Sequence, residues 1–254
     1  MEADLRPHRS RYGLNAKAKA EDPAAFAAQA EMVCTAYAYA PMLEALGCHV
    51  VSTDEMTGIQ ALERAAPTKP MRPGCPERRE HEYIRHGTLS QIATFNVATG
   101  AVIAPALGPT RTEVDFAAHI AQVLDTDPDA PWLFIADNLN THQSETLVRL
   151  IATRCHLPDD LGVKGRAGIL HSQATRATFL SDPDHRIQFL YTPTHTSWLN
   201  QIELWFSILA RRVLKRGDCA SLAALEQRIR DFIAYFNQTA APFKWTYKGR
   251  PLCR

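Results

Sequence analysis

Three acidic residues, Asp54, Asp137 and Glu203, occur where the surrounding sequence predicts an ordered, largely buried backbone. Residues 48–54 are a short β-branched stretch that predicts a strand ending at Asp54, and the apolar run 132–137 predicts a strand ending at Asp137. If the two strands are parallel, their carboxyl ends meet at one edge of the sheet, where open α/β sheets bind ligands. Two carboxylates about 4 Å apart repel by roughly 4 kcal/mol at an effective dielectric constant near 20, so we expect a cation between them.

Glu203 falls on the apolar face of a helix that the sequence predicts to begin with Ser197 as its N-cap. Residues at three- and four-residue intervals form one apolar stripe, namely Leu199, Ile202, Phe206, Leu209 and Val213. Because Glu203 lies in this stripe, its carboxylate is expected to face the protein, where it needs a cation or hydrogen-bond donors. Three carboxylates without a cluster of thiolates or imidazoles favour a hard cation such as Mg²⁺ or Mn²⁺.

Each acid also has a purely structural interpretation. Asp54 could cap the segment that follows it, and Asp137 could form a turn with its successor. Glu203 could pair with an arginine such as Arg186 or Arg211. The combination of two acids after predicted strands and a third on a predicted helix favours one shared site over three unrelated structural roles.

Three segments carry a family resemblance: Ser-Thr-Asp-Glu at 52–55, Asp-Asn-Leu-Asn-Thr-His at 137–142, and Tyr-Thr-Pro-Thr-His-Thr-Ser-Trp-Leu-Asn-Gln-Ile-Glu at 191–203. Over nearly its whole length, the chain resembles the catalytic domain of mariner-type bacterial insertion-sequence transposases, members of the Asp-Asp-Glu superfamily of transposases and integrases. The resemblance implies an α/β, ribonuclease-H-like fold in which a mixed sheet is flanked by helices. It also implies that the three acids bind metal and that the enzyme cuts and joins DNA during cut-and-paste transposition.

Asn138, His142 and Asn200 lie inside these segments and are candidate supporting residues. His142 could orient a metal ligand or contact a phosphate, although a single histidine at a helix start is more often a local hydrogen-bonding residue. The expected chemistry is an in-line displacement at phosphorus with two Mg²⁺ or Mn²⁺ ions about 3.5–4 Å apart. The nucleophile is water during cleavage and a DNA 3′-hydroxyl during strand transfer.

The chain is long enough to bury one good core and too short for two full domains. We expect an N-terminal arm and linker helix over residues 1–45, a catalytic domain over 46–240 and a C-terminal tail over 241–254. The second and third acids are 66 positions apart, which is longer than is common in the family. The excess maps to residues 157–186, whose glycines and prolines predict an inserted loop with a short helix at about 173–180.

The net charge of +1 does not by itself predict a nucleic-acid partner, so the case for DNA is local. A basic cluster follows Glu203 on the same predicted helix and consists of Arg211, Arg212, Lys215 and Arg216. These cations could contact phosphates, although a basic run is more often a solvated helix end. Residues 67–86 are a basic, proline-rich excursion between the first two predicted strands. By resemblance, such a loop reaches DNA or a partner subunit, and the enzyme acts as a homodimer on DNA.

Six cysteines form no Cys-x-x-Cys pair, and no apolar run reaches the length of a membrane span. We therefore expect reduced thiols, no membrane contact, and a cytoplasmic, nucleoid-associated protein. The main alternative is a catalytically silent transposase remnant that binds DNA or a partner. A small-molecule phosphatase is a weaker alternative, because it leaves the basic cluster unexplained.

Overall fold

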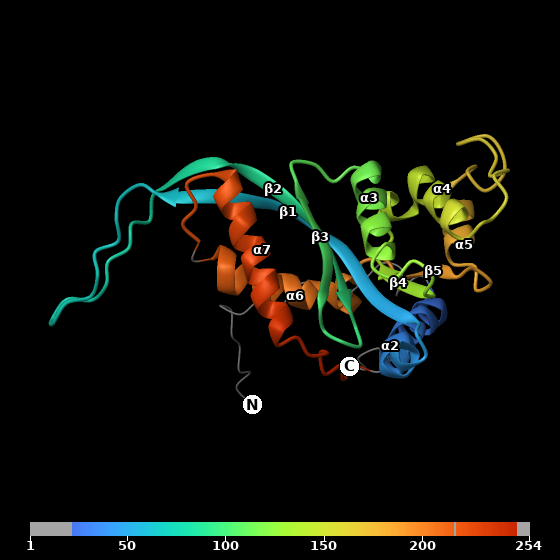
Figure 1. Ribbon diagram of the computed structural model, residues 1–254, viewed down its shortest axis with the longest axis horizontal. Coiled ribbons are helices and arrows are strands. Elements are labelled where there is room, and N and C mark those ends of the chain that lie inside the picture. Colours follow the sequence, from blue (N-terminus) through green and yellow to red (C-terminus); the bar gives the residue numbers. More distant parts are fainter. Residues whose placement is uncertain (1–21, 216, 248–254) are drawn as a thin grey trace, which may run out of the picture.

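The computed structural model describes residues 22–215 and 217–247, which form a five-stranded mixed sheet in the order β3-β2-β1-β4-β5 (Figure 1). The strands are β1 (His49–Arg64), β2 (Tyr83–Asn96), β3 (Val102–Gly108), β4 (Trp132–Ala136) and β5 (Ile187–Tyr191). The first three strands pair antiparallel, whereas β4 pairs parallel with both β1 and β5. The predicted mixed sheet is therefore confirmed.

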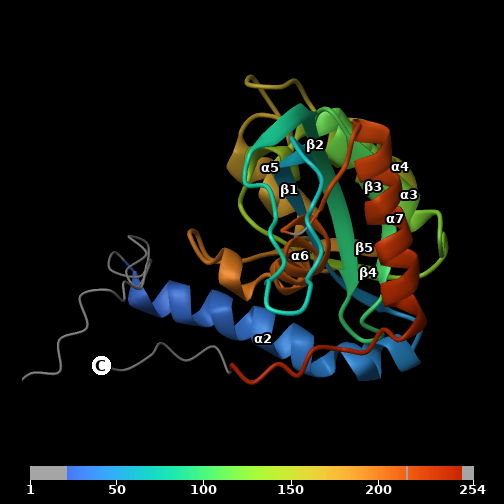
Figure 2. The same ribbon diagram turned by 90° about the vertical axis from the view of Figure 1, so that its left-hand side faces the viewer.

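Helices cover both faces of this sheet (Figures 1 and 2). They are α2 (Pro23–Ala45), α3 (Glu113–Leu124), α4 (Glu145–Arg154), α5 (Gln173–Leu180), α6 (Ile202–Leu209) and α7 (Leu222–Gln238). One face packs against α3, α4 and α5, and the other packs against α2, α6 and α7. Three shorter segments complete the fold: the 3₁₀ turns η1 (Asn140–Gln143) and η2 (Ser197–Leu199), and the π-helical segment η3 (Ala210–Leu214).

Two helix starts follow the local signals in the sequence. The side chain of Asp22 accepts a hydrogen bond from Ala25 N at 2.9 Å, and Pro23 occupies the first position of α2. A proline there is favourable because its missing N–H has no partner within the helix. In the same way, the Ser221 hydroxyl accepts a hydrogen bond from Ala224 N at 3.1 Å at the start of α7. Both helices therefore begin at residue types that favour a helix start.

Strand β1 continues well past Asp54, which corrects the prediction that it ends there. Its parallel pairing with β4 stops at Ser52, but its antiparallel pairing with β2 continues to Arg64. The partner strand therefore keeps β1 extended beyond the end of its pairing with β4. The loop at residues 65–82 projects from the end of this two-stranded ribbon (Figure 1), and the last four residues of the predicted basic excursion belong to β2.

The start of α6 also differs from the prediction, because Ser197 caps no helix and begins the short turn η2 instead. The first N–H groups of α6 find partners on other elements. Ile202 N donates to Ser52 Oγ at 2.8 Å, and Gln201 N donates to the Tyr37 hydroxyl at 3.3 Å. A tertiary contact thus replaces the expected local cap. The predicted apolar stripe is confirmed, since all five of its members are buried.

Residues 157–186 connect α4 to β5 and include α5 at the predicted place. Leu161, Leu170 and Leu180 from this segment are buried in the core shared by α3, α4 and the sheet. The segment is therefore part of the packed domain and not only a surface loop. No helix in the part of the chain that the structure describes is long and apolar enough to cross a membrane.

Candidate metal centre

Asp54 and Asp137 reach the same region because of the register between β1 and β4. Ser52 of β1 pairs with Ile135 of β4 at the end of the parallel ladder. Asp54 lies two residues after Ser52, and Asp137 lies two residues after Ile135. Asp137 directly follows the last residue of β4. Two carboxylates therefore lie at the edge of the sheet that the sequence indicated, although only one of them follows the end of its strand.

Asn200 attaches the segment that carries Glu203 to β1. Its side chain is fully buried, and Nδ2 donates to Asp54 Oδ2 at 3.2 Å and to Thr53 O at 3.0 Å. Ser52 Oγ donates to Asn200 Oδ1 and accepts from Ile202 N. Because Glu203 is the next residue of α6, these bonds fix the origin of its helix relative to Asp54.

The charges of the three acids act on one another. Burial and the nearby Asp137 raise the pKa of Asp54 to about 7, and the same two causes raise the pKa of Glu203. Burial also opposes ionisation of Asp137, but a hydrogen bond from His142 and its charge outweigh this and lower the pKa of Asp137. Asp54 and Glu203 are thus held in an environment that disfavours their anions, which is expected for carboxylates that are partly buried close to another carboxylate.

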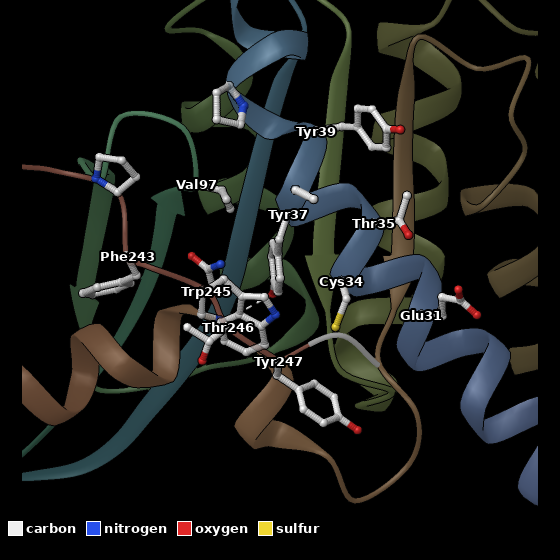
Figure 3. A pocket seen from close by; sticks show the side chains of 14 residues that line it. Glu31, Cys34, Thr35, Tyr37, Tyr39, Val97, Phe243, Trp245, Thr246 and Tyr247 are labelled. Carbon is white, nitrogen blue, oxygen red and sulfur yellow. Dashed lines mark hydrogen bonds between the residues drawn. The ribbon is translucent and has the colours of Figure 1, made fainter. Parts of the chain in front are cut away.

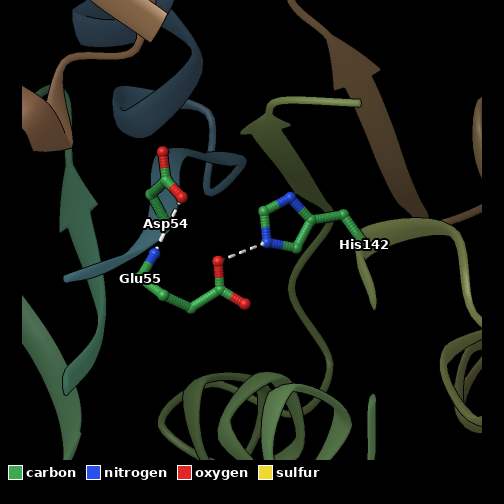
Figure 4. A group of neighbouring side chains, drawn as sticks. All are labelled: Asp54, Glu55 and His142. Atoms are coloured by element: carbon green, nitrogen blue, oxygen red, sulfur yellow. Dashed lines mark hydrogen bonds and ion pairs between the residues drawn. The ribbon is translucent and has the colours of Figure 1, made fainter. Parts of the chain in front are cut away.

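His142 and Glu55 form a hydrogen-bonded chain with Asp137. His142 Nδ1 lies 2.7 Å from Asp137 Oδ1, and Nε2 lies 3.1 Å from Glu55 Oε2. Figure 4 shows the Glu55 carboxylate directed at the ring, with Asp54 on the other side of the strand. One ligand atom from each of Asp54, Glu55 and His142 lies within 4.8 Å of the others. The sequence analysis does not identify Glu55 as a site residue. The available signal is its position directly after Asp54 in the Ser-Thr-Asp-Glu segment.

The structural alternatives for the acids are resolved differently. Asp54 caps no turn, because it lies within β1. Asp137 does form the local turn, since its Oδ1 accepts from Leu139 N at 2.9 Å, and this leaves Oδ2 without a hydrogen-bond partner among residues 22–215 and 217–247. Within the same residues Glu203 has no ion pair with an arginine, and Arg186 instead donates to the carbonyl groups of Ala130 and Arg154.

The DDE superfamily endonuclease model matches residues 49–226, which is most of the chain and includes all three acids. This chain belongs to the DDE superfamily endonucleases. Its structure is similar to the Mos1 mariner paired-end complex with Mn, with 11% identity, a TM-score of 0.53 and coverage of 92% of this chain and 60% of that chain. The corresponding values for a pre-cleavage Mos1 transpososome are 12%, 0.51, 91% and 60%. No curated protein matches significantly.

These likenesses confirm the ribonuclease-H-like fold of this DDE endonuclease. The chain spans about 60% of the length of the Mos1 chains that it matches. Within the matched region, Asn138 contacts other parts of the fold, because Nδ2 donates to Thr192 O at 2.5 Å and Oδ1 accepts from Gln143 Nε2 at 3.1 Å. It therefore connects the ends of β4 and β5 near Asp137.

The basic cluster of this DDE endonuclease follows α6 on the π-helical segment η3, not on a continuous α-helix. Arg211, Arg212 and Lys215 are exposed, and none of them has an ion-pair partner in the described part of the chain. Arg211 and Arg212 line a shallow groove against α7. Arg216 lies outside the described residues.

Aromatic residues of the C-terminal segment pack against both α2 and η2 of the DDE endonuclease. Trp245 packs edge-on against Tyr37 with ring centroids 5.0 Å apart, and Tyr247 packs in the same way against Trp198. Tyr37 in turn donates its hydroxyl to Leu199 O at 2.8 Å. Figure 3 shows Tyr37, Trp245 and Tyr247 around a pocket beside α2, which none of the three acids lines. The contacts of Trp245, Tyr247 and Tyr37 support the segment that leads to Glu203.

Proposed function

We propose that this chain is the catalytic domain of a DNA transposase, in which Asp54, Asp137 and Glu203 bind two divalent ions, Mg²⁺ or Mn²⁺. The domain hydrolyses phosphodiester bonds at transposon ends and joins the freed 3′-hydroxyl to target DNA. The observation that carries this proposal is the parallel register of β1 and β4, which brings Asp54 and Asp137 to one edge of the sheet. In support of Glu203, burial and the charge of Asp137 raise its pKa, and no arginine or lysine in the described residues forms an ion pair with it.

The donor set fits a hard divalent cation. All three proposed ligands are carboxylates, which suit Mg²⁺ and Mn²⁺. The raised pKa values of Asp54 and Glu203 mean that the fold itself supplies too little positive charge for them. A cation bound between them would offset the repulsion that the protein leaves uncompensated.

When bound, the ions would activate the attacking hydroxyl group and stabilise the leaving oxygen. The protein's own part is to hold the ligands. Asn200 fixes Asp54 relative to α6, and the apolar stripe of α6 keeps Glu203 facing the sheet edge. Arg211, Arg212 and Lys215 are exposed beyond Glu203, where they would contact phosphates along the DNA without reading its bases.

The partner in this proposal is DNA, both transposon ends and target. The Mos1 structures named above are a paired-end complex with Mn and a pre-cleavage transpososome, and they support this assignment by similarity of fold. We extend the proposal to a homodimer on DNA, acting at the bacterial nucleoid in the cytoplasm. The loop at residues 65–82 would contact DNA or the partner subunit.

A plasmid-nicking assay with EDTA, Mg²⁺ or Mn²⁺ tests the proposal. We expect nicking only with a divalent ion, and none by Asp54→Asn, Asp137→Asn or Glu203→Gln. Glu63→Gln is the matched control, because Glu63 lies on β1 but pairs with His86 away from the three acids. Metal-dependent DNA binding or shifts of melting temperature without any nicking would favour the catalytically silent alternative.

A further inference from the structure

Glu55 and His142 are buried beside the proposed ligands but have no part in the chemistry described so far. Their side chains are 1% and 0% exposed. The two ring nitrogens of His142 face carboxylate oxygens on opposite sides, Asp137 Oδ1 at 2.7 Å and Glu55 Oε2 at 3.1 Å, so the ring bridges the two acids.

The side chain of Glu55 leaves β1 on the opposite face from that of its neighbour Asp54. Within the β1–β2 pair, Asp54 lies beside Ala93 and Glu55 beside Ile92. Ala93 packs in the core under α6 and α7, whereas Ile92 packs in the core under α3 and α4. Adjacent strand residues point to opposite faces. Glu55 is therefore directed toward η1, where His142 and Thr141 Oγ1 occupy its two carboxylate oxygens at 3.1 and 3.5 Å.

The His142 ring is held from several sides. Phe116 of α3 packs against it with ring centroids 4.3 Å apart. The backbone of His142 is held as well, since Tyr191 donates its hydroxyl to His142 O at 2.9 Å. A ring fixed in this way can fix the rotation of the carboxylate to which it donates, and that carboxylate is Asp137.

We propose that Glu55 and His142 are positioning residues for Asp137. Glu55 orients the ring, and the ring holds Asp137 Oδ1, so that Oδ2 is the oxygen presented to a divalent cation. This inference rests on the proposed metal site. It assigns no metal contact to Glu55 or His142, although their ligand atoms lie close to Asp54. Loss of such an orienting partner typically weakens metal binding by about 10–100-fold.

The test is a Mn²⁺ titration of the full chain, in which the electron paramagnetic resonance signal of free Mn²⁺ gives both affinity and stoichiometry. We expect His142→Ala to bind Mn²⁺ about 10–100-fold more weakly, with the number of bound ions unchanged. Glu55→Ala should also bind more weakly. The double variant should bind no more weakly than His142→Ala alone, because Glu55 acts only through the ring.

Two conservative variants sharpen this test. In Glu55→Gln the side-chain carbonyl still accepts the Nε2 hydrogen, so it should recover part of the affinity lost in Glu55→Ala. His142→Asn is the second conservative variant. If the alanine variants do not fold, Glu55→Gln and His142→Asn replace them, and Glu55→Gln should lose less Mn²⁺ affinity than His142→Asn. Glu63→Gln is the matched control and should bind like wild type, because the Glu63–His86 pair, 2.7 Å apart, lies further along β1.

Three results would overturn the inference: one fewer Mn²⁺ bound by Glu55→Gln, additive losses in the double variant, or wild-type affinity in His142→Ala. The first would make Glu55 a ligand. Nicking by the same samples separates the two proposals. If Mn²⁺ binding by the wild-type protein depends on Glu55 and His142 but the protein does not cut DNA, only the transposase proposal is contradicted. Variants that bind and cut like an active wild type contradict only the positioning role.

Discussion

Asn200 Nδ2 donates a hydrogen bond to Asp54 Oδ2 at 3.2 Å, so the segment carrying the third acid is attached directly to the first acid. The two residues are far apart in sequence and meet only because α6 packs over β1 and β2. A side-chain amide at this point satisfies a carboxylate without adding charge, which leaves the site acidic enough to require a cation.

Replacing Asn200 should therefore damage both stability and the site. Asn200→Ala leaves Thr53 O, Ser52 Oγ and one oxygen of Asp54 without their buried partner. Each unsatisfied buried group costs about 1–3 kcal/mol, and we expect a clear loss in urea unfolding. Asn200→Asp keeps the shape but adds a negative charge. It should be less stable than wild type without metal, and recovery of its stability by Mn²⁺ is the distinguishing measurement.

Asp54 and Asp137 should respond in opposite ways to loss of charge. The environment opposes the Asp54 anion, so Asp54→Asn should stabilise the metal-free protein at pH 8, by at most about 4 kcal/mol. The Asp137 carboxylate forms an ion pair with buried His142. Because Asp137→Asn removes the negative charge of this pair, it should lower the melting temperature. Melting in EDTA measures both. A rise in melting temperature for Asp137→Asn would show that repulsion from Asp54 and Glu203 outweighs the histidine contact.

The pH dependence follows from the raised pKa of Asp54. In the unfolded chain Asp54 loses its proton near pH 3.8, but in the folded protein it keeps it until about pH 7. Between these values the folded state binds more protons, so its stability falls as pH rises. We expect the metal-free protein to lose stability from pH 4 to 7, and Asp54→Asn to flatten this slope. The measurement is chemical unfolding of both proteins at several pH values. Equal slopes of stability against pH in wild type and Asp54→Asn would show that Asp54 is solvated and would contradict the prediction.

Tyr37 should matter to catalysis although it lies on α2, far from Glu203 in sequence. Its hydroxyl donates to Leu199 O and accepts from Gln201 N, and its ring packs against Trp245. Tyr37→Phe leaves both backbone groups buried without a partner, at a cost of about 1–3 kcal/mol. Nicking should fall while the fold remains intact by circular dichroism. Tyr39→Phe, an exposed neighbour on the same helix, is the control.

Arg211, Arg212 and Lys215 should contribute to DNA affinity without sequence preference. Alanine at all three positions should weaken binding to any duplex and reduce the slope of log K against log salt by at most about 2.7. The control is Arg149→Ala with Arg154→Ala, which removes one exposed and one half-buried cation from α4 on the opposite face of the sheet. Unchanged affinity in the triple variant, measured by fluorescence anisotropy, would show that the cluster is a solvated helix end.

The sequence by itself determined the elements whose signals are local. Apolar periodicity predicted the stripe of α6, the apolar run predicted β4, and the pattern within residues 157–186 predicted the short helix α5. Family resemblance added the mixed sheet and the family. These features depend on residues a few positions apart, so the chain encodes them wherever it folds.

Tertiary structure decided what depends on partners distant in sequence. Strand β1 continues to Arg64 because β2 pairs with it there, and α6 begins at Ile202 because Ser52 and Tyr37 satisfy its first N–H groups. Glu55 turned out to belong beside His142 because register and strand alternation place the two together. No local pattern records these contacts, since each is formed only when separate elements pack and their buried polar groups must find partners.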